Sequence, residues 1–357
     1  MGHHVNQTIC LKRAPVMKFP SPVLITGASG FVGGHLAQTL AEKNVKTKLL
    51  VRQTSRLPFE VGPNMELCYG DVTDEDSLRK AALGVKVIFH LAGALRSDDF
   101  SYYKNINVEG TRNVCEAAAR VKGLKKMVFV SSLSAAGPSK AGRPIDETMT
   151  GNPVSYYGKS KLMAEDIVQS FGKKFPWTIL RPGAVYGPRE KDIFNYFKMV
   201  RQGLVLLPGD DSQEVSFVHV MDLVEVMTRA ALSPKTTGQV YFVSDGSGYR
   251  WGQIASYIGK ALNKSYLTIK VPIGIVKIVA HLSGLWGRVT GKPAILNGNK
   301  VKEALVPGWV CSNRKLCRDL SFKPRFDLRR GIADTARFYL QEGWLKPTDK
   351  PLSRGKK

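Results

Sequence analysis

The stretch Thr26-Gly27-Ala28-Ser29-Gly30-Phe31-Val32-Gly33 joins a short apolar run, residues 23–26, to an apolar helical pattern that continues through residues 36–42. Glycines in such a turn let backbone N–H groups approach a pyrophosphate, and the N-terminus of the following helix adds partial positive charge. The spacing is Gly-x-x-Gly-x-x-Gly rather than Gly-x-Gly-x-x-Gly, but its place between a strand and a helix is typical of a dinucleotide site. The alternative is a tight turn with a structural role alone. The residues predicted to bind a dinucleotide here are Gly27, Ser29, Gly30, Phe31, Val32 and Gly33.

The chain after this turn alternates strand patterns with helical patterns. Strands separated by helices indicate parallel βαβ units, and right-handed crossovers place the helices on both faces of the sheet. We therefore predict the α/β class, with a doubly wound parallel-sheet Rossmann domain and a smaller C-terminal substrate lobe. Strands are expected at 23–26, 47–51, 65–70, 85–91, 127–132 and 177–181, and helices near 36–42, 75–82, 103–121 and 155–171.

The pattern loosens after residue 183, where prolines and glycines interrupt it. Strands at 215–220 and 240–243 are expected to be late additions to the same sheet. The predicted division is a cofactor-binding domain at 21–185 and 215–245, a substrate lobe at 186–214 and 246–345, and tails at 1–20 and 346–357.

Composition limits the classes of protein that fit. The chain has 357 residues, 43% hydrophobic and 23% charged, which is the range of ordinary globular proteins. Its five cysteines form no Cys-x-x-Cys pair or Cys/His cluster, so neither a disulfide framework nor a metal site is expected. No secretory pattern and no run of about 18 apolar residues occurs, and a cytoplasmic location is expected.

The net charge of +24 is high, and more than half of it falls in residues 264–357. Such a field favours anionic partners, but a basic and otherwise ordinary surface is the preferred explanation. No nucleic-acid motif accompanies the charge, so no nucleic-acid partner is expected. The apolar stretch 271–282 is either a helix packed over the substrate pocket or an interfacial helix that gives peripheral membrane contact and suits a lipophilic substrate.

An acid–base pair is predicted at the start of the helix near 155–171. Tyr157 and Lys161 are four residues apart and therefore share a helix face. A neighbouring ammonium is expected to lower the pKa of the tyrosine toward the range that suits proton transfer. Tyr156 has Ser160 at the same spacing and is the poorer candidate.

The end of the second strand bears on the choice between NAD and NADP. An acidic residue there binds the ribose 2′-hydroxyl, whereas an arginine accommodates a 2′-phosphate. Arg52 stands at this point, so NADP(H) is the preferred cofactor. NAD(H), bound through Asp71 and backbone groups, is the alternative.

These features together resemble the extended short-chain dehydrogenase/reductase family over roughly residues 22–262. The family comprises NAD-dependent epimerases and dehydratases as well as proteins like 3-beta-hydroxysteroid dehydrogenase and dihydroflavonol reductase. The motifs that carry the likeness are the glycine turn, Gly70-Asp71-Val72-Thr73-Asp74, His90-Leu91-Ala92-Gly93, Val130-Ser131-Ser132, Tyr157-x-x-x-Lys161, Arg181-Pro182-Gly183 and Phe217-Val218-His219-Val220-Met221-Asp222.

The resemblance implies roles for further residues. Ser132 is the catalytic serine, and Asn107 either supports the lysine through hydrogen bonds or has a structural role alone. The remaining cofactor contacts that it implies are Asp71 and Val72 beside the adenine, Leu91, Ala92 and Gly93 along the cofactor, and Pro182 and Gly183 at the nicotinamide. Pairing of the helices near 103–121 and 155–171 into a homodimer is a further implication.

Three chemistries compete within this family. Ser132 is followed by Leu133 without an Asp-Glu pair, which argues against a dehydratase. Sugar-nucleotide enzymes tend to place an arginine just before the strand at 217–219, and this chain has Gln213 there. We therefore predict an NAD(P)-dependent ketone/alcohol oxidoreductase, with a nucleotide-sugar epimerase as the alternative. A catalytically silent NADP-binding sensor or scaffold is ranked third, because Tyr157 and Lys161 are both present.

Overall fold

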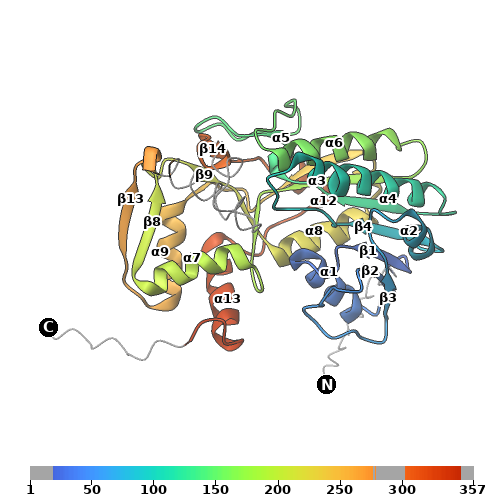
Figure 1. The fold of residues 1–357 in the computed structure, drawn as a ribbon, viewed down its shortest axis with the longest axis horizontal. Coiled ribbons are helices and arrows are strands. Elements are labelled where there is room, and N and C mark those ends of the chain that lie inside the picture. The colour runs from blue at the N-terminus through green and yellow to red at the C-terminus, as the bar shows by residue number, and fades with distance from the viewer. Residues whose placement is uncertain (1–18, 276–277, 279–301, 347–357) are drawn as a thin grey trace, which may run out of the picture.

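The structure, a computed structural model, describes residues 19–275, 278 and 302–346 (Figure 1). The tails predicted at 1–20 and 346–357 lie outside these residues except for positions 19, 20 and 346. Most of the apolar stretch 271–282 also lies outside them.

A seven-stranded sheet forms the larger part of the molecule. Its order is β11-β6-β5-β4-β1-β2-β3, and every pair of neighbouring strands is parallel. One half of the sheet consists of β1, β2 and β3, and the chain then crosses over to place β4 on the other side of β1. This topology confirms the predicted doubly wound α/β class. The strands are β1 (Val23–Thr26), β2 (Thr47–Val51), β3 (Met65–Tyr69), β4 (Val87–His90), β5 (Lys126–Val130), β6 (Trp177–Pro182) and β11 (Gln239–Val243).

Helices cover both faces of this sheet (Figure 1). Side chains alternate between the faces along each strand, so Val23 and Ile25 enter one core while Leu24 enters the other. The first core is closed by α1 (Phe31–Glu42), α8 (Val220–Leu232) and α12 (Arg314–Leu320). The second is closed by α2 (Glu75–Ala82), α4 (Gly110–Ala119) and α6 (Tyr156–Ser170).

The long helix predicted near 103–121 is a composite. It begins earlier, as α3 (Phe100–Tyr103), continues through a π-helical segment η1 (Lys104–Glu109), and ends as α4. Short helices α5 (Leu133–Ala136) and η2 (Pro234–Thr236) follow β5 and α8.

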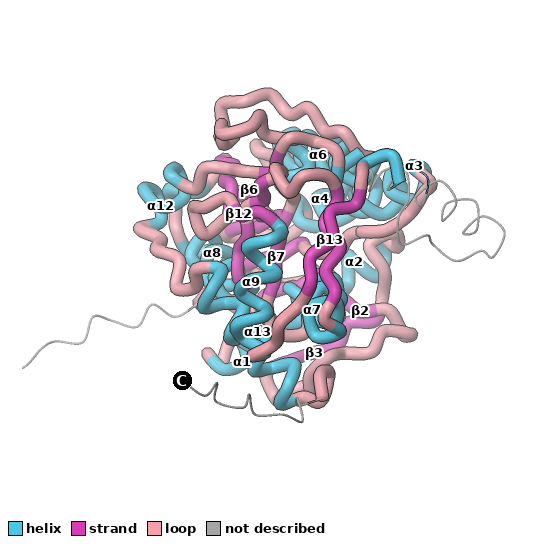
Figure 2. Tube along the Cα trace, turned by 90° about the vertical axis from the view of Figure 1, so that its left-hand side faces the viewer, coloured by secondary structure: helices cyan, strands magenta, loops and turns pink. Residues whose placement is uncertain are grey.

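A lobe of small sheets lies beside the carboxyl ends of the large sheet, and in Figure 2 this lobe faces the viewer. Its described sheets pair β7 (Ala184–Tyr186) with β10 (Phe217–His219), β8 (Leu204–Pro208) with β13 (Leu267–Val271), and β9 (Glu214–Val215) with both β12 (Tyr249–Arg250) and β14 (Gly308–Trp309). Helices α7 (Lys191–Gln202), α9 (Trp251–Leu262) and α13 (Leu328–Gln341) pack on a core rich in aromatic rings, among them Tyr186, Phe197, Phe217 and Tyr339.

One predicted strand is wrong. Residues 215–220 were expected to extend the large sheet, but they divide between β9 and β10, which belong to two small sheets. Ser216 lies at the division, and its carbonyl oxygen accepts from the Ala184 N–H at 2.9 Å. A short apolar run predicts a buried strand without saying which sheet it joins. The strand at 240–243 does belong to the large sheet, as β11.

Candidate active site

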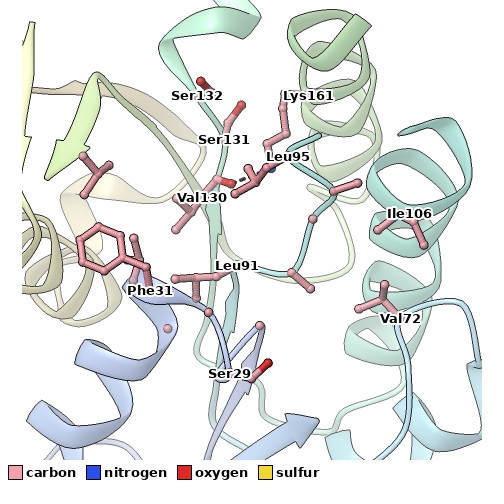
Figure 3. A pocket seen from close by; sticks show the side chains of 18 of the residues that line it. Ser29, Phe31, Val72, Leu91, Leu95, Ile106, Val130, Ser131, Ser132 and Lys161 are labelled. Carbon is pink, nitrogen blue, oxygen red and sulfur yellow. Dashed lines mark hydrogen bonds between the residues drawn. The ribbon is translucent and has the colours of Figure 1, made fainter. Parts of the chain in front are cut away.

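A cavity of about 520 Å³ lies along the carboxyl ends of the large sheet, where ligands bind in doubly wound folds. All the residues predicted to bind the cofactor line this cavity, and Ser132 lines it with them. Figure 3 shows Ser29 and Phe31 of the glycine turn on one side, with Ser132 and Lys161 on the other. The sequence positions therefore converge on one site, although they come from both halves of the sheet.

The glycine turn needs glycine at two points. Gly27 has a φ of +77°, and a Cβ there would lie 2.7 Å from the Ala92 nitrogen. A Cβ on Gly33 would lie 2.2 Å from the Gly27 carbonyl oxygen, so α1 approaches the turn too closely for a side chain. Gly30 is the N-cap of α1 and has no side chain to occupy the first-turn amides. This cradle fits a dinucleotide pyrophosphate.

A buried network supports the turn from beneath. The Ala92 N–H donates to Thr26 Oγ1 at 3.2 Å, and Thr26 Oγ1 lies 2.7 Å from His90 Nδ1. His90 Nε2 lies 2.9 Å from Thr111 Oγ1. Burial, assisted by the charge of Lys161, lowers the pKa of His90 to about 3, so the ring is neutral at physiological pH. The sequence places this histidine in a motif but does not indicate its role in the network.

Ser132 and Tyr157 form the centre of the candidate catalytic group. Ser132 follows β5 as the N-cap of α5 and accepts from the Ser134 N–H at 3.1 Å. Burial raises the pKa of Tyr157 to about 12, and a hydrogen bond with Ser132 acts in the opposite direction. The phenol is therefore neutral at physiological pH and able to donate a proton.

The position of Lys161 corrects one expectation. Its Nζ donates to the Val130 carbonyl oxygen at 2.8 Å (Figure 3) and lies 4.2 Å from the centre of the Phe129 ring. Burial lowers the pKa of Lys161 to about 7, and the charge of Glu165 acts in the opposite direction. The expected lowering of the Tyr157 pKa by this ammonium is thus wrong for this arrangement, because burial dominates both side chains.

Asn107 is buried within the π-helical segment and does not line the cavity. Its Oδ1 accepts from the Ala94 N–H at 2.7 Å, and its Nδ2 donates to the Ala94 carbonyl oxygen at 3.2 Å and to Ser160 Oγ at 2.8 Å. The side chain thus joins the loop after β4 to α6, one residue before Lys161. This placement suits a supporting role.

A buried ion pair behind the strand ends was missed by the sequence analysis. Arg181 donates to Glu165 from Nε at 3.0 and 3.1 Å and from a terminal nitrogen at 2.6 Å. The Ser131 hydroxyl donates to the same carboxylate. Ser131 is therefore engaged away from Tyr157, which agrees with the preference for Ser132. A charged residue at the end of an otherwise apolar strand was the available signal.

The end of β2 carries the residues that bear on cofactor choice. Arg52 is exposed and lines the cavity together with Ser55. Asp71 also lines it, but its Oδ1 accepts from the Thr73 N–H at 3.0 Å and the Thr73 hydroxyl at 2.9 Å. One carboxylate oxygen is thus already engaged within its own turn.

The fold and the cavity define a dinucleotide-binding protein of the Rossmann type. Residues 23–244 match the model of the NAD dependent epimerase/dehydratase family. The chain belongs to this family, whose members are NAD-dependent enzymes, and the extended short-chain dehydrogenase/reductase resemblance is confirmed.

Relatives in this family carry different activities in their names. The chain is 28% identical over 325 residues to a ceramide reductase of Caulobacter vibrioides, covering 90% of this chain and 96% of that protein. It is 30% identical over 289 residues to the N-acetyl-alpha-D-glucosaminyl-diphospho-ditrans,octacis-undecaprenol 4-epimerase of Escherichia coli O157:H7, covering 79% and 84%. It is 29% identical over 341 residues to a 3 beta-hydroxysteroid dehydrogenase/Delta 5-->4-isomerase of Mycobacterium tuberculosis, covering 89% and 90%.

Solved structures agree on the fold. The crystal structure of gox2253 superposes with a TM-score of 0.75 at 28% identity and covers 91% of this chain and 99% of that one. The complex of MoeE5 with UDP-glucuronic acid and NAD superposes with a TM-score of 0.73 at 23% identity, covering 90% and 100%.

Proposed function

We propose that this protein is an NAD(P)-dependent oxidoreductase that interconverts a ketone and a secondary alcohol. The observation that carries the proposal is the convergence of a neutral Tyr157, Ser132 and Lys161 beside a glycine cradle that fits a dinucleotide. The cofactor, when bound, supplies or accepts the hydride at the substrate carbon.

In the reducing direction, the chain's own residues act on the substrate oxygen. Ser132 donates a hydrogen bond to the carbonyl oxygen and orients it. Tyr157 donates its phenolic proton to that oxygen as negative charge develops there. Lys161 is fixed by its hydrogen bond to the Val130 carbonyl oxygen, and it lines the cavity one helical turn beyond Tyr157. Asn107 holds the helix that carries both residues.

We further propose a lipophilic substrate. The three relatives above are named for a ceramide, an undecaprenol-linked sugar and a hydroxysteroid. Gln213 stands where sugar-nucleotide enzymes tend to have an arginine, and its amide donates to the carbonyl oxygens of residues 303, 304 and 306. That side chain is therefore engaged in the lobe and brings no positive charge for a diphosphate.

NADP(H) is the preferred cofactor in this proposal, and NAD(H) is the alternative. Arg52 at the cavity supports binding of a 2′-phosphate. The internal hydrogen bonds of Asp71 leave less acceptor capacity for a ribose 2′-hydroxyl.

A nucleotide-sugar epimerase is the second candidate, and the epimerase relative at 30% identity favours it. A panel of sterol-like ketones, ceramide-like ketones and nucleotide sugars separates the two. We expect stoichiometric NADPH oxidation with a lipophilic ketone. Conversion of a nucleotide sugar without net cofactor consumption would instead identify an epimerase. Tight NADPH binding with neither activity would identify a sensor or scaffold.

We also propose two contacts outside the cavity. A homodimer through the α4 and α6 side fits the exposure of Tyr156 and Met163 on α6. Peripheral membrane contact would suit a lipophilic substrate, and the stretch 271–282 considered for it lies mostly outside the described residues. Among the helices that the structure describes, none is long and apolar enough to cross a membrane.

A further inference from the structure

A carboxylate from the lobe reaches the start of the helix that carries Tyr157. Glu303 Oε1 accepts from Ser155 Oγ at 2.7 Å. Ser155 is the N-cap of α6, and its Oγ accepts from the Gly158 N–H at 3.1 Å. One serine hydroxyl thus connects the carboxylate to the first turn of α6, two residues before the catalytic tyrosine.

The backbone around Glu303 is held in place by the lobe. Gln213 Nε2 lies 3.3 Å from the Glu303 carbonyl oxygen, 3.1 Å from that of Ala304 and 2.8 Å from that of Val306. Trp309 Nε1 donates to the Glu303 carbonyl oxygen at 2.9 Å. The strand that follows, β14, pairs with β9. The carboxylate is therefore presented by a fixed segment.

Several groups face the Tyr157 phenol. Ser132 contributes a hydrogen bond, and Tyr103 of α3 packs with its ring centre 6.2 Å from that of Tyr157. Lys161 lies one turn further along α6, with its ammonium on the Val130 carbonyl. Among the described groups that act on Tyr157, Glu303 is the negatively charged one, and its charge raises the pKa of both Tyr157 and Tyr103.

We propose that Glu303 is a positioning residue of the active site, which holds the N-terminus of α6 and keeps a negative charge at the start of the helix that carries Tyr157. A carboxylate there also interacts favourably with the positive end of the α6 dipole. The charge disfavours the phenolate and thereby keeps Tyr157 a proton donor. The consequence for catalysis, a phenol that stays protonated and able to donate to a carbonyl oxygen, rests on the function proposed above.

The test compares Glu303→Gln with Glu214→Gln, which removes the same charge from the neighbouring strand β9. Protein labelled at the tyrosine ring is titrated by NMR, and the Tyr157 signal is assigned by its loss in Tyr157→Phe. We expect Glu303→Gln to lower the pKa of Tyr157 by roughly one unit, and Glu214→Gln to leave it as in the wild type. Glu303→Asp, which keeps the charge, should restore most of the difference.

The outcomes separate this inference from the proposed function. A Tyr157 titration curve that is the same in Glu303→Gln and in the wild type overturns the inference, even if the variant is less stable. A shift in that curve supports it whatever the substrate is. With a lipophilic alcohol as substrate, oxidation below the pKa of Tyr157 should then be several-fold faster in Glu303→Gln at the same pH. Failure of the wild type on every ketone and alcohol would refute the proposed function alone.

Discussion

The part of the chain that carries the cofactor cradle and the lobe that covers it are built in different ways. Helices connect strands β1 to β6 of the large sheet, except for the loop between β2 and β3, and the core around these strands is mainly aliphatic. The described part of the lobe has short strands in three small sheets and a core rich in aromatic rings. Its tyrosines bond over long sequence distances: Tyr186 Oη donates to the Asp327 carbonyl, and Tyr339 Oη donates to the Glu190 carbonyl. The difference indicates that local pattern builds the cofactor site, whereas distant contacts build the lobe.

Tyr-to-Phe substitutions in the two regions should separate chemistry from stability. We expect Tyr157→Phe to reduce turnover by about 10²–10⁴-fold while NADPH still binds, because the proton donor is lost. Tyr339→Phe should retain turnover and lower the free energy of unfolding by about 1 kcal/mol, because one hydrogen bond is lost. Steady-state kinetics and denaturant unfolding measure the two effects. Near-normal turnover by Tyr157→Phe would contradict its assignment.

Gly-to-Ala substitutions break one region at a time. Gly33→Ala forces a methyl group onto the Gly27 carbonyl and should cost roughly 3 kcal/mol of stability, together with most of the cofactor affinity. Gly331→Ala in the lobe meets the Tyr186 hydroxyl at 2.0 Å, so it should lower stability while cofactor affinity is largely kept. Calorimetry of NADPH binding and thermal unfolding compare them. Gly62→Ala is the control, since nothing lies within 4 Å of its Cβ.

Arg52→Ala tests the cofactor preference at the end of β2. Loss of a charged hydrogen-bond donor to a 2′-phosphate should weaken NADPH binding by roughly tenfold to a hundredfold and leave NADH binding nearly unchanged. The matched control is Arg56→Ala, an exposed arginine that does not line the cavity. Equal or tighter binding of NADH by the wild type would refute the preference.

Lys161→Met tests whether the buried lysine makes the free energy of unfolding depend on pH. The pKa of Lys161 is lowered from 10.5 to about 7, so between these values the unfolded chain binds more protons than the folded one. The lysine therefore makes the free energy of unfolding rise with pH across this window, by up to about 1.4 kcal/mol per unit. The variant should show a flatter dependence in urea unfolding at several pH values. An unchanged slope, or the same flattening in exposed Lys159→Met, would argue against a buried, weakly basic lysine.

Much of the fold was predictable because its signals are local. The expected bounds of β1 and β2 agree with the structure, as do those of α2 at 75–82. The start of α2, for example, is marked by the Asp74 N-cap, which accepts from the Ser77 and Asp76 N–H groups. The prediction for residues 215–220 was wrong because a short apolar run does not show which strand it will pair with.

The candidate site also contains residues that the sequence predicts and residues that it does not. The glycine turn, Ser132 and the pair of Tyr157 and Lys161 stand in compact motifs, and the structure brings them to one cavity. Glu165 and Glu303 stand in no motif, and their contacts with Arg181 and Ser155 join distant parts of the chain. The sequence could show neither contact, because both depend on the packing of the whole fold.

The π-helical segment Lys104–Glu109 determines which way the side chains of the following helix α4 point around the helix axis. A π-turn holds one residue more than an α-turn, and each residue turns an α-helix by about 100°. Asn107 lies within the widened turn, while Thr111 and Val114 face the sheet immediately beyond it. If one residue were removed from this segment, the helix would become a regular α-helix. The contacts of Asn107 with α6 and those of Val114 with the core could then not both be kept. The irregular turn therefore allows one continuous helix to hold Ser160 of α6 through Asn107 and to pack Val114, further along, into the hydrophobic core.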